Sequence, residues 1–267
     1  MFFERPITEI IDERHAVRTY EERLLPKETI VAIQHYIQEV LSPYEGKVRI
    51  EFLQNVNEKE KVKLGTYGVI KGGKYYLTAA CKKGENNPIT LGYALEKIVL
   101  YCTSLGLGTV WMGGTYNKSQ FAKAMKLQED EELLIIVPVG YESDKKSFVA
   151  KLMGNHNKQR KEFETIFFDK TVGTPLTRNA AGRYETALEM VRLAPSAMNQ
   201  QPWRAVKQGE RFDFYVVNTK GLKSIDLGIA LAHFYMTLSE QGISGAFRKE
   251  QPMQDSSMAY VVSWIAN

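Results

Sequence analysis

The same order of structural elements occurs twice in this chain, and this repeat restricts the possible folds more than any other feature of the sequence. Leu91-Gly92-Tyr93-Ala94-Leu95 matches Leu227-Gly228-Ile229-Ala230-Leu231 at a spacing of 136 positions, and both predicted helices end at a glycine, Gly106 or Gly242. An earlier amphipathic helix and a closing apolar strand also recur in order, over residues 30–41 and 184–193 and over residues 133–139 and 259–265. Chance can produce the short match but not four elements in one order, so we infer an internal duplication.

Length and composition are those of a globular protein. With 267 residues, 44% of them hydrophobic, the chain can bury the core of one large domain or of two smaller ones. Its 35 basic and 31 acidic residues are mixed along the sequence and give a net charge of +4 without a polybasic tract. Nucleic acid is therefore not an expected partner, whereas a local basic pocket for a phosphate group is compatible with this charge.

The sequence carries no pattern typical of membrane insertion, metal binding or disulfide formation. Residues 1–6 lack the basic-then-apolar pattern of a signal peptide, and the longest apolar run, residues 133–139, is too short to span a bilayer. We therefore expect no membrane partner and a cytoplasmic location. Cys81 and Cys102 lie in apolar settings without CxxC spacing, which predicts buried thiols, and the four histidines are scattered, so no metal site is expected.

Periodicity and capping residues predict the other elements. Thr8 is expected to cap a short helix that runs to about Arg14, and Pro26 opens a second helix. The central helix of the first half, residues 89–106, has a wide apolar stripe and is expected to lie in the core. Three shorter elements complete the first half: strands over residues 47–54 and 74–81, and a helix near residues 119–125.

A polar loop, Ala194 to Trp203, follows the helix over residues 184–193 and is expected to be neither helix nor strand. Its two prolines fix φ and remove backbone donors, while Ser196, Asn199 and two glutamines supply hydrogen-bonding groups and Trp203 ends the loop with an aromatic ring. Two interpretations stay open. The loop is either a rigid ligand-binding segment or an ordinary helix-to-strand connection, since Pro, Ser and Asn are common turn formers.

Two other short patterns allow a functional and a structural interpretation. Arg14 and Arg18 lie just beyond a helix end, where they either converge on one anion or remain solvated surface charges. Gly113-Gly114 indicates either a close approach of the backbone to a ligand or a tight turn. Gly106-Leu107-Gly108 follows a helix instead of a strand, which excludes the dinucleotide-binding fingerprint.

Together these patterns resemble the FMN-dependent nitroreductase family over nearly the whole chain. The resemblance rests on five segments: Arg14 to Arg18, the helix that ends in Gly106-Leu107-Gly108-Thr109, Gly113-Gly114, Lys158-Gln159-Arg160, and Pro195 to Trp203. In that family two identical α+β subunits form a dimer with FMN at the interface. Here the basic segments and the glycine turn lie in the first half and the Pro-Ser-x-x-Asn loop lies in the second. The chain therefore resembles a subfamily in which one polypeptide is a duplicated pseudo-dimer.

The resemblance implies an α+β, nitroreductase-like fold built from two repeated halves. Residues 1–170 would form the first half and residues 171–267 the second, each with a mainly antiparallel sheet and a central core helix. The halves would pack as an intramolecular pseudo-dimer, so the protein is expected to act as a monomer.

The resemblance also implies which residues contact FMN. Cations would hold the phosphate, the glycine turn would face N5, and the polar loop would cover the ring and ribityl chain from the other half. The implied set is Arg14, His15, Ala16, Arg18, Lys71, Gly113, Gly114, Lys158, Arg160, Pro195, Ser196, Ala197 and Asn199. Lys71 is placed at the pyrimidine edge of the flavin. No side chain is expected to act as a catalyst, because the flavin carries the chemistry.

The chain departs from the family pattern at two places. Ala16 stands where family members commonly have Ser, so one phosphate hydrogen bond is missing or comes from a backbone N–H. In the second half, Arg178 and Arg183 do not repeat the Arg14–Arg18 spacing, and residues 42–45 do not match the polar loop. One FMN per chain is therefore expected.

The implied activity is hydride transfer from NAD(P)H through the flavin N5 to a small electron acceptor such as a nitroaromatic or a quinone. Two alternatives stay open from the sequence. The first is a protein that stores FMN or senses redox state without turnover, and the second is a structural α+β protein with a degenerate site.

Overall fold

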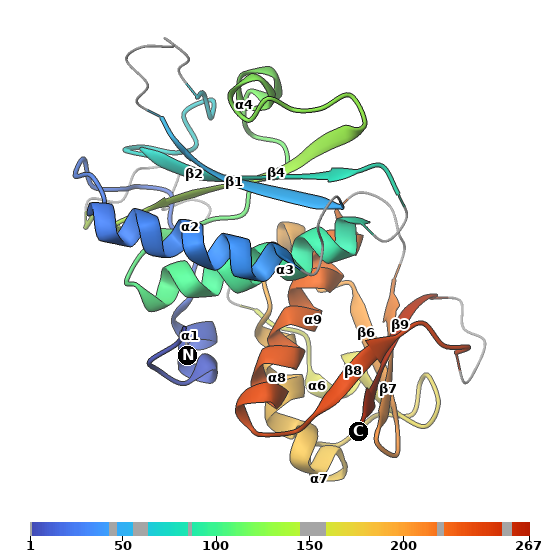
Figure 1. The fold of residues 1–267 in the computed structure, drawn as a ribbon. Helices are drawn as coiled ribbons and strands as arrows, with labels where there is room; N and C mark the ends of the chain where they lie inside the picture. Colours follow the sequence, from blue (N-terminus) through green and yellow to red (C-terminus); the bar gives the residue numbers. More distant parts are fainter. Residues whose placement is uncertain are drawn as a thin grey trace.

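The computed structural model describes residues 2–42, 47–55, 64–84, 87–144, 159–217, 222–252 and 258–267. Two sheets, each with its own helices, are joined through two long helices that cross between them (Figure 1). No helix in the described ranges has the length and apolar character needed to cross a bilayer.

The first half builds a four-stranded antiparallel sheet in the order β1-β2-β4-β3. Its core strand β2 is buried along most of its length because α3 and α2 cover one face and α4 lies over the other (Figure 1). The elements are α1 (Ile7–Glu13), α2 (Lys27–Leu41), β1 (Val48–Gln54), β2 (Tyr75–Lys82), α3 (Asn87–Ser104), β3 (Gly108–Thr109), α4 (Lys118–Ala124) and β4 (Glu131–Gly140).

The second half builds a five-stranded sheet in the order β5-β6-β7-β9-β8, antiparallel except for the β5–β6 pair. Helices α8 and α9 pack together, and α9 contacts β6 and β7. The elements are α6 (Phe163–Ile166), β5 (Phe167–Asp169), α7 (Arg178–Ala181), η2 (Gly182–Tyr184), α8 (Glu185–Leu193), η3 (Ala197–Asn199), β6 (Trp203–Gln208), β7 (Arg211–Val216), α9 (Lys223–Glu240), β8 (Gly245–Arg248) and β9 (Ala259–Ala266).

The two halves repeat each other in detail. The order β1-β2-β4-β3 recurs as β6-β7-β9-β8. Both central helices end at a glycine with positive φ, 72° at Gly106 and 71° at Gly242, and at each end the next residue donates its N–H to a carbonyl of the last turn. The β2–β4 and β7–β9 pairs also shift register at corresponding positions, after Ala79 and after Phe214. The prediction of two repeated halves with antiparallel sheets and central helices is confirmed.

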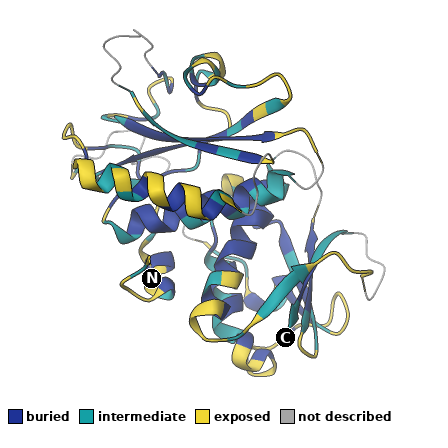
Figure 2. Cartoon of the chain, in the orientation of Figure 1, coloured by how far each residue is buried: buried dark blue, intermediate teal, exposed yellow. Residues whose placement is uncertain are grey.

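Helices α3 and α9 cross at two glycines that lie at matched positions. A Cβ atom on Gly92 would stand 2.2 Å from the carbonyl oxygen of Ile225, and one on Gly228 would stand 2.1 Å from that of Ile89. Each backbone therefore lies against the other, and an approximate two-fold axis passes through the crossing. Both helices are largely buried along this contact, whereas α2 exposes its outer face (Figure 2).

The two sheets differ at their outer edges, because the second sheet has an additional edge strand, β5, in the segment that connects the halves. After β4 the chain passes to the second half, where β5 pairs parallel with β6. The corresponding edge strand of the first half, β1, pairs with β2 alone among the described residues. Residues 167–169, which lie before the predicted boundary at residue 170, thus belong to the second sheet. The domain boundary itself stays a prediction.

Three local predictions were wrong. Thr8 lies inside α1, and the cap comes from the other half, because the Ile7 N–H donates to a carboxylate oxygen of Glu240 at 2.6 Å. The polar loop contains a short 3₁₀ turn at Ala197–Asn199. Trp203, which was expected to belong to the loop, is the first residue of β6, and its ring is fully buried in the core.

Candidate cofactor site

An extended segment runs from Arg14 to Tyr20 and pairs with two separate parts of the first half. The Val17 N–H donates to the carbonyl of Thr109 at 2.9 Å, and Gly108 permits this approach because a Cβ atom there would meet the Val17 side chain. Farther along, the Lys71 N–H donates to the carbonyl of Arg18 at 3.0 Å. Because the segment is extended, Arg14 and Arg18 lie roughly 13 Å apart along it, at about 3.3 Å per residue.

The polar loop of the second half has a strained backbone. Met198, Asn199 and Gln201 all have positive φ, of 51°, 55° and 48°. Residues other than glycine adopt this region at a cost, and such strain is concentrated at ligand-binding and catalytic segments. Two hydrogen bonds brace the loop: the Gln201 N–H donates to Ser196 Oγ at 2.9 Å, and the Ala197 N–H donates to Asp226 Oδ1 at 3.0 Å.

Residues 159–161, which precede α6, form hydrogen bonds with this loop. Arg160 donates from Nη1 to Asn199 Oδ1 at 2.6 Å and from Nη2 to the carbonyl of Leu193 at 2.7 Å. The Asn199 amide in turn donates to the carbonyl of Gln159 at 2.7 Å. The predicted residues Arg160 and Asn199 are therefore in direct contact, although 39 positions separate them.

The arginines of the chain divide into two groups. Carboxylates pair with one group, namely Arg5, Arg23, Arg49, Arg178, Arg183, Arg192 and Arg211. Within the described ranges no carboxylate ion pair holds the other group, namely Arg14, Arg18, Arg160, Arg204 and Arg248. Arg248 is exposed on β8, whereas the remaining four are partly buried. The pKa of each of these four arginines is lowered, and burial is the main cause.

Arg14 and Arg160 lie near enough for their charges to interact, although they are far apart in the sequence. Burial lowers the pKa of Arg160 to about 10, and the positive charges of Arg14 and Arg192 lower it further. Burial also lowers the pKa of Arg14, against the opposing effect of Glu96. Two neighbouring, partly desolvated guanidinium groups repel each other, and an anion bound between them would relieve both the repulsion and the desolvation.

Glu96 belongs to a buried group that joins the central helices. His233 Nδ1 donates to the carbonyl of Met190 at 2.8 Å, and Nε2 lies 2.8 Å from Glu96 Oε1, with both side chains fully buried. Trp111 Nε1 donates to the other carboxylate oxygen at 3.0 Å. The group fixes Trp111, two residues before the glycine turn.

The glycine turn lies against the start of α9. A Cβ atom on Gly113 would stand 2.2 Å from Leu222 Cδ1, and Leu222 accepts the Asp226 N–H at 3.0 Å. Gly114 has open space, and neither glycine has a positive φ. Asp226 thus lies one helical turn from the residue that touches Gly113 while its carboxylate holds the polar loop.

The structure brings some predicted residues together and separates others. Arg14, Arg160 and Asn199 form one cluster, Arg18 lies beside Lys71, and no hydrogen bond within the described ranges joins the Arg14 and Arg18 side chains. His15 is exposed and lies 2.7 Å from a Glu142 carboxylate oxygen, and Ala16 pairs through its backbone with Thr109. Pro195, Ser196 and Ala197 line the strained loop, while Lys158 lies outside the described residues. The cofactor role of each of these residues stays a prediction.

Sequence reasoning missed four nearby residues. Lys161 and Arg204 directly follow segments already singled out, so their positions beside Arg160 and Trp203 were the available signal. The sequence gives no signal for Glu96 and Asp226, because a lone carboxylate in a helical pattern normally predicts an exposed position. Both carboxylates are buried in the structure.

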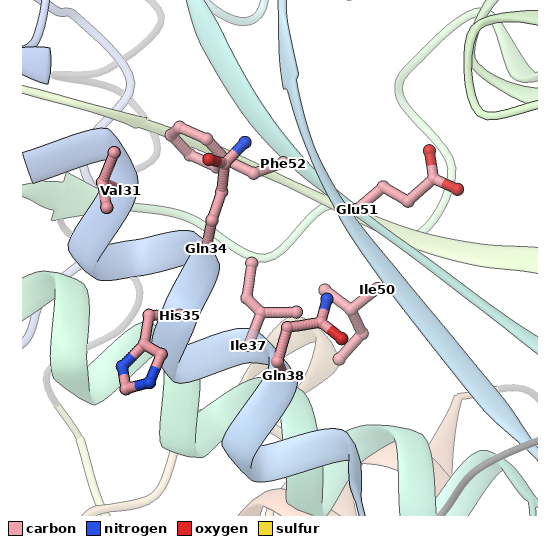
Figure 3. Close-up of a pocket in the computed structure, with 8 residues that line it drawn as sticks. All are labelled: Val31, Gln34, His35, Ile37, Gln38, Ile50, Glu51 and Phe52. Carbon is pink, nitrogen blue, oxygen red and sulfur yellow. The ribbon is translucent and has the colours of Figure 1, made fainter.

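Of two cavities in the structure, one lies away from the Arg14–Arg160 cluster and the other lies next to Arg14. The larger, of about 480 Å³, is an open groove between α2 and β1 with Gln34, Gln38 and Phe52 among its lining residues (Figure 3). A smaller one of about 110 Å³ adjoins Arg14, but Glu13 and Glu142 also line it. Neither gathers cations as the Arg14–Arg160 cluster does.

Comparisons with known proteins agree with this arrangement. A crystal structure described as a putative nitroreductase from Thermotoga maritima MSB8 is 22% identical, with a TM-score of 0.62 over 98% of this chain and 94% of that chain. A nitroreductase family protein from Clostridium difficile 630 is 19% identical, with a TM-score of 0.46 over 58% of this chain and 92% of that chain. No curated protein matches the chain. The sequence profile of one family matches residues 6–238, which is most of the chain, and the chain therefore belongs to the family described as "Putative TM nitroreductase".

Proposed function

We propose that this protein is an FMN-dependent oxidoreductase that passes hydride from NAD(P)H through the flavin N5 to a small electron acceptor such as a nitroaromatic or a quinone. One observation carries the proposal: Arg14 and Arg160, two partly buried arginines without a carboxylate ion pair among the described residues, interact electrostatically, and Arg160 donates a hydrogen bond to the strained loop of the second half. An α+β protein with a degenerate site has no reason to retain such a costly arrangement. Family membership supports the same reaction class.

The residues present fit an FMN phosphate. Arg14 and Arg160 supply two neighbouring cations from different parts of the chain, and a phosphomonoester carries close to two negative charges at neutral pH. Arg160 is already oriented by Asn199 and by the Leu193 carbonyl, so little side-chain freedom would be lost on binding. Lys158 would add a third cation by its position in the sequence.

The remaining predicted residues would bind the flavin ring. In this proposal the Gly113-Gly114 backbone faces N5, Lys71 lies toward the pyrimidine edge, and the loop Pro195 to Asn199 covers the ring from the second half. Arg18 stays a candidate for the phosphate. Bound flavin supplies reversible two-electron chemistry, with hydride accepted and released at N5. The protein binds, orients and tunes the electrostatics. Because one chain contains both sides of this site, a monomer is sufficient.

Arg160→Ala is expected to separate phosphate binding from ring binding. Loss of a charge-assisted contact costs about 1.5–3 kcal/mol, so FMN affinity should fall about ten- to a hundred-fold. Riboflavin, which lacks the phosphate, should bind almost unchanged. Quenching of flavin fluorescence on titration with apoprotein measures both affinities. Arg248→Ala removes an exposed, unpaired arginine and serves as the matched control. Equal losses of FMN and riboflavin would contradict the phosphate role.

The purified protein is expected to bind one FMN per chain of 30.4 kDa. The site residues of the two halves are complementary, and in the second half Arg178 is committed to ion pairs with Glu185 and Glu189. Flavin released by denaturation, measured by absorbance against protein concentration, should approach a ratio of one. A ratio near two would show that the second half retains a site, and a colourless protein that takes up no FMN would overturn the proposed function.

A further inference from the structure

Three further cations lie on the other side of the polar loop. Lys161, Arg204 and Lys223, here called the rim triad, are all partly buried. Lys161 Nζ donates to the Gln200 carbonyl at 2.8 Å and lies 3.3 Å from the Gln201 carbonyl oxygen. Arg204 Nη1 donates to the same Gln201 oxygen at 3.1 Å. Two cationic groups therefore converge on a single backbone oxygen.

The rim triad has no carboxylate ion pair among the described residues. Burial lowers the pKa of Lys161, and the charges of Arg204 and Lys223 lower it further, so the three groups repel one another. Asp226 lies three residues after Lys223 on α9, but its carboxylate is buried, accepts the Ala197 N–H and has a pKa raised by burial to about 7. Because this carboxyl is partly protonated near neutral pH, it does not neutralise the positive charge of the triad.

The rim triad is separate from the proposed phosphate cluster yet adjoins the same site. The charges that act on Arg160 are those of Arg14 and Arg192, whereas the charges that act on Lys161 are those of the other two triad members. Lys223 directly follows Leu222, which touches Gly113. The triad therefore links the strained loop to the start of α9, beside the residue that touches the glycine turn.

We infer that the rim triad binds the 2′-phosphate of NADPH and makes NADPH the preferred hydride donor. This inference rests on the proposed function. The 2′-phosphate is a phosphomonoester with close to two negative charges, whereas NADH carries a neutral hydroxyl at that position. The nicotinamide must reach the flavin N5, which the glycine turn faces in the proposed site, so the rest of the dinucleotide can extend from that turn along the polar loop and the start of α9, where the triad lies. Three unpaired cations match a dianion and give no advantage to a hydroxyl.

Lys223→Gln tests the assignment with the least disturbance, because Lys161 and Arg204 also hold the loop backbone. For the FMN-loaded protein, we expect kcat/KM for NADPH to exceed that for NADH by ten-fold or more. The substitution should lower kcat/KM for NADPH about ten-fold, mainly through KM, and leave the value for NADH within two-fold. Lys118→Gln makes the same change of charge at an exposed ion pair on α4 and should alter neither value. Equal losses for both donors would assign the triad to the shared pyrophosphate and overturn the inference.

A binding measurement distinguishes failure of this inference from failure of the proposed function. Calorimetric titration of the purified protein with 2′,5′-ADP and with 5′-AMP needs no turnover. The inference predicts tighter binding of 2′,5′-ADP, with the difference lost in Lys223→Gln. Equal binding of the two nucleotides to a yellow, active protein would overturn the inference and leave the proposed function standing. A preference for 2′,5′-ADP would support the triad site even if no electron acceptor were reduced.

Discussion

Asp226→Asn is expected to remove a loss of stability that the wild type undergoes as the pH rises from about 4 to about 7. Asp226 is 4% exposed, its Oδ1 accepts the Ala197 N–H, and its Oδ2 is buried without a partner among the described residues. Burial raises the pKa of this carboxyl from 3.8 to about 7. The group is therefore held largely protonated in the folded protein where it would be ionised in the unfolded chain.

This difference sets the sign and the range of the effect. Between about pH 4 and pH 7 the folded state binds one more proton than the unfolded state, so the free energy of unfolding falls as pH rises. A shift of about three units corresponds to roughly 4 kcal/mol over the whole range, at 1.36 kcal/mol per unit. Asparagine keeps the acceptor for the Ala197 N–H but does not titrate. The variant should lack this loss and become more stable than the wild type above about pH 7.

Urea unfolding at a series of pH values from 5 to 8.5 measures this difference. Comparison of variant with wild type cancels the other carboxylates, such as Glu131, whose pKa is lowered by a hydrogen bond to Arg49 and which contributes with the opposite sign. Asp213→Asn is the matched control. Asp213 is equally buried but pairs with Arg211 at 2.6 Å, so its loss should destabilise the protein at neutral pH. Parallel pH profiles for Asp226→Asn and wild type would show that Asp226 titrates normally.

Gly92→Ala is expected to cost at least about 3 kcal/mol, at the upper end of overpacking effects. The new methyl group would stand 2.2 Å from the carbonyl oxygen of Ile225, and backbone atoms cannot move aside without separating α3 from α9. The gain of about 1 kcal/mol in helix propensity offsets only part of this cost. Gly228→Ala should have a similar effect, because its new Cβ would stand 2.1 Å from the carbonyl oxygen of Ile89.

The control for this experiment is Gly114→Ala, where a Cβ atom meets nothing within 4 Å. Guanidinium unfolding should give a large loss for each crossing variant and a small change for the control. Because the crossing joins the halves, the crossing variants should also release bound flavin at lower denaturant concentration. Near-wild-type stability of Gly92→Ala would mean that the helices are not held together at this point.

The repeated elements could be predicted from the sequence because each rests on local periodicity. The matched motifs at Gly92 and Gly228 identified both central helices, and Gly106 and Gly242 gave their ends. The contact between these glycines could not be foreseen, since no local rule says which face of one buried helix meets another. The same holds for β5, a three-residue strand whose pairing depends on where the connecting segment crosses to the second half.

For the candidate site, the sequence indicated residue types but not their grouping. Arg14 and Arg18 are close in sequence, and extended backbone separates their Cα atoms, while electrostatic coupling links Arg14 to Arg160. Whether Arg14 and Arg18 share one anion stays a prediction. Trp203 was expected to end the polar loop, and instead it is the first residue of β6 and its ring lies in the core. Asp226 was missed because its burial depends on the loop that it holds.

The crossing of α3 and α9 has a genetic consequence. In a dimer of identical subunits every substitution appears twice, and residues near the axis must tolerate their own copies. Here each position changes alone. Glu96 faces His233 across the crossing, while the residues at the corresponding repeat positions are Ala232 and Lys97. Joining the halves in one gene thus allows an acid on one helix and a histidine on the other. Each half can therefore evolve a different function within the shared site.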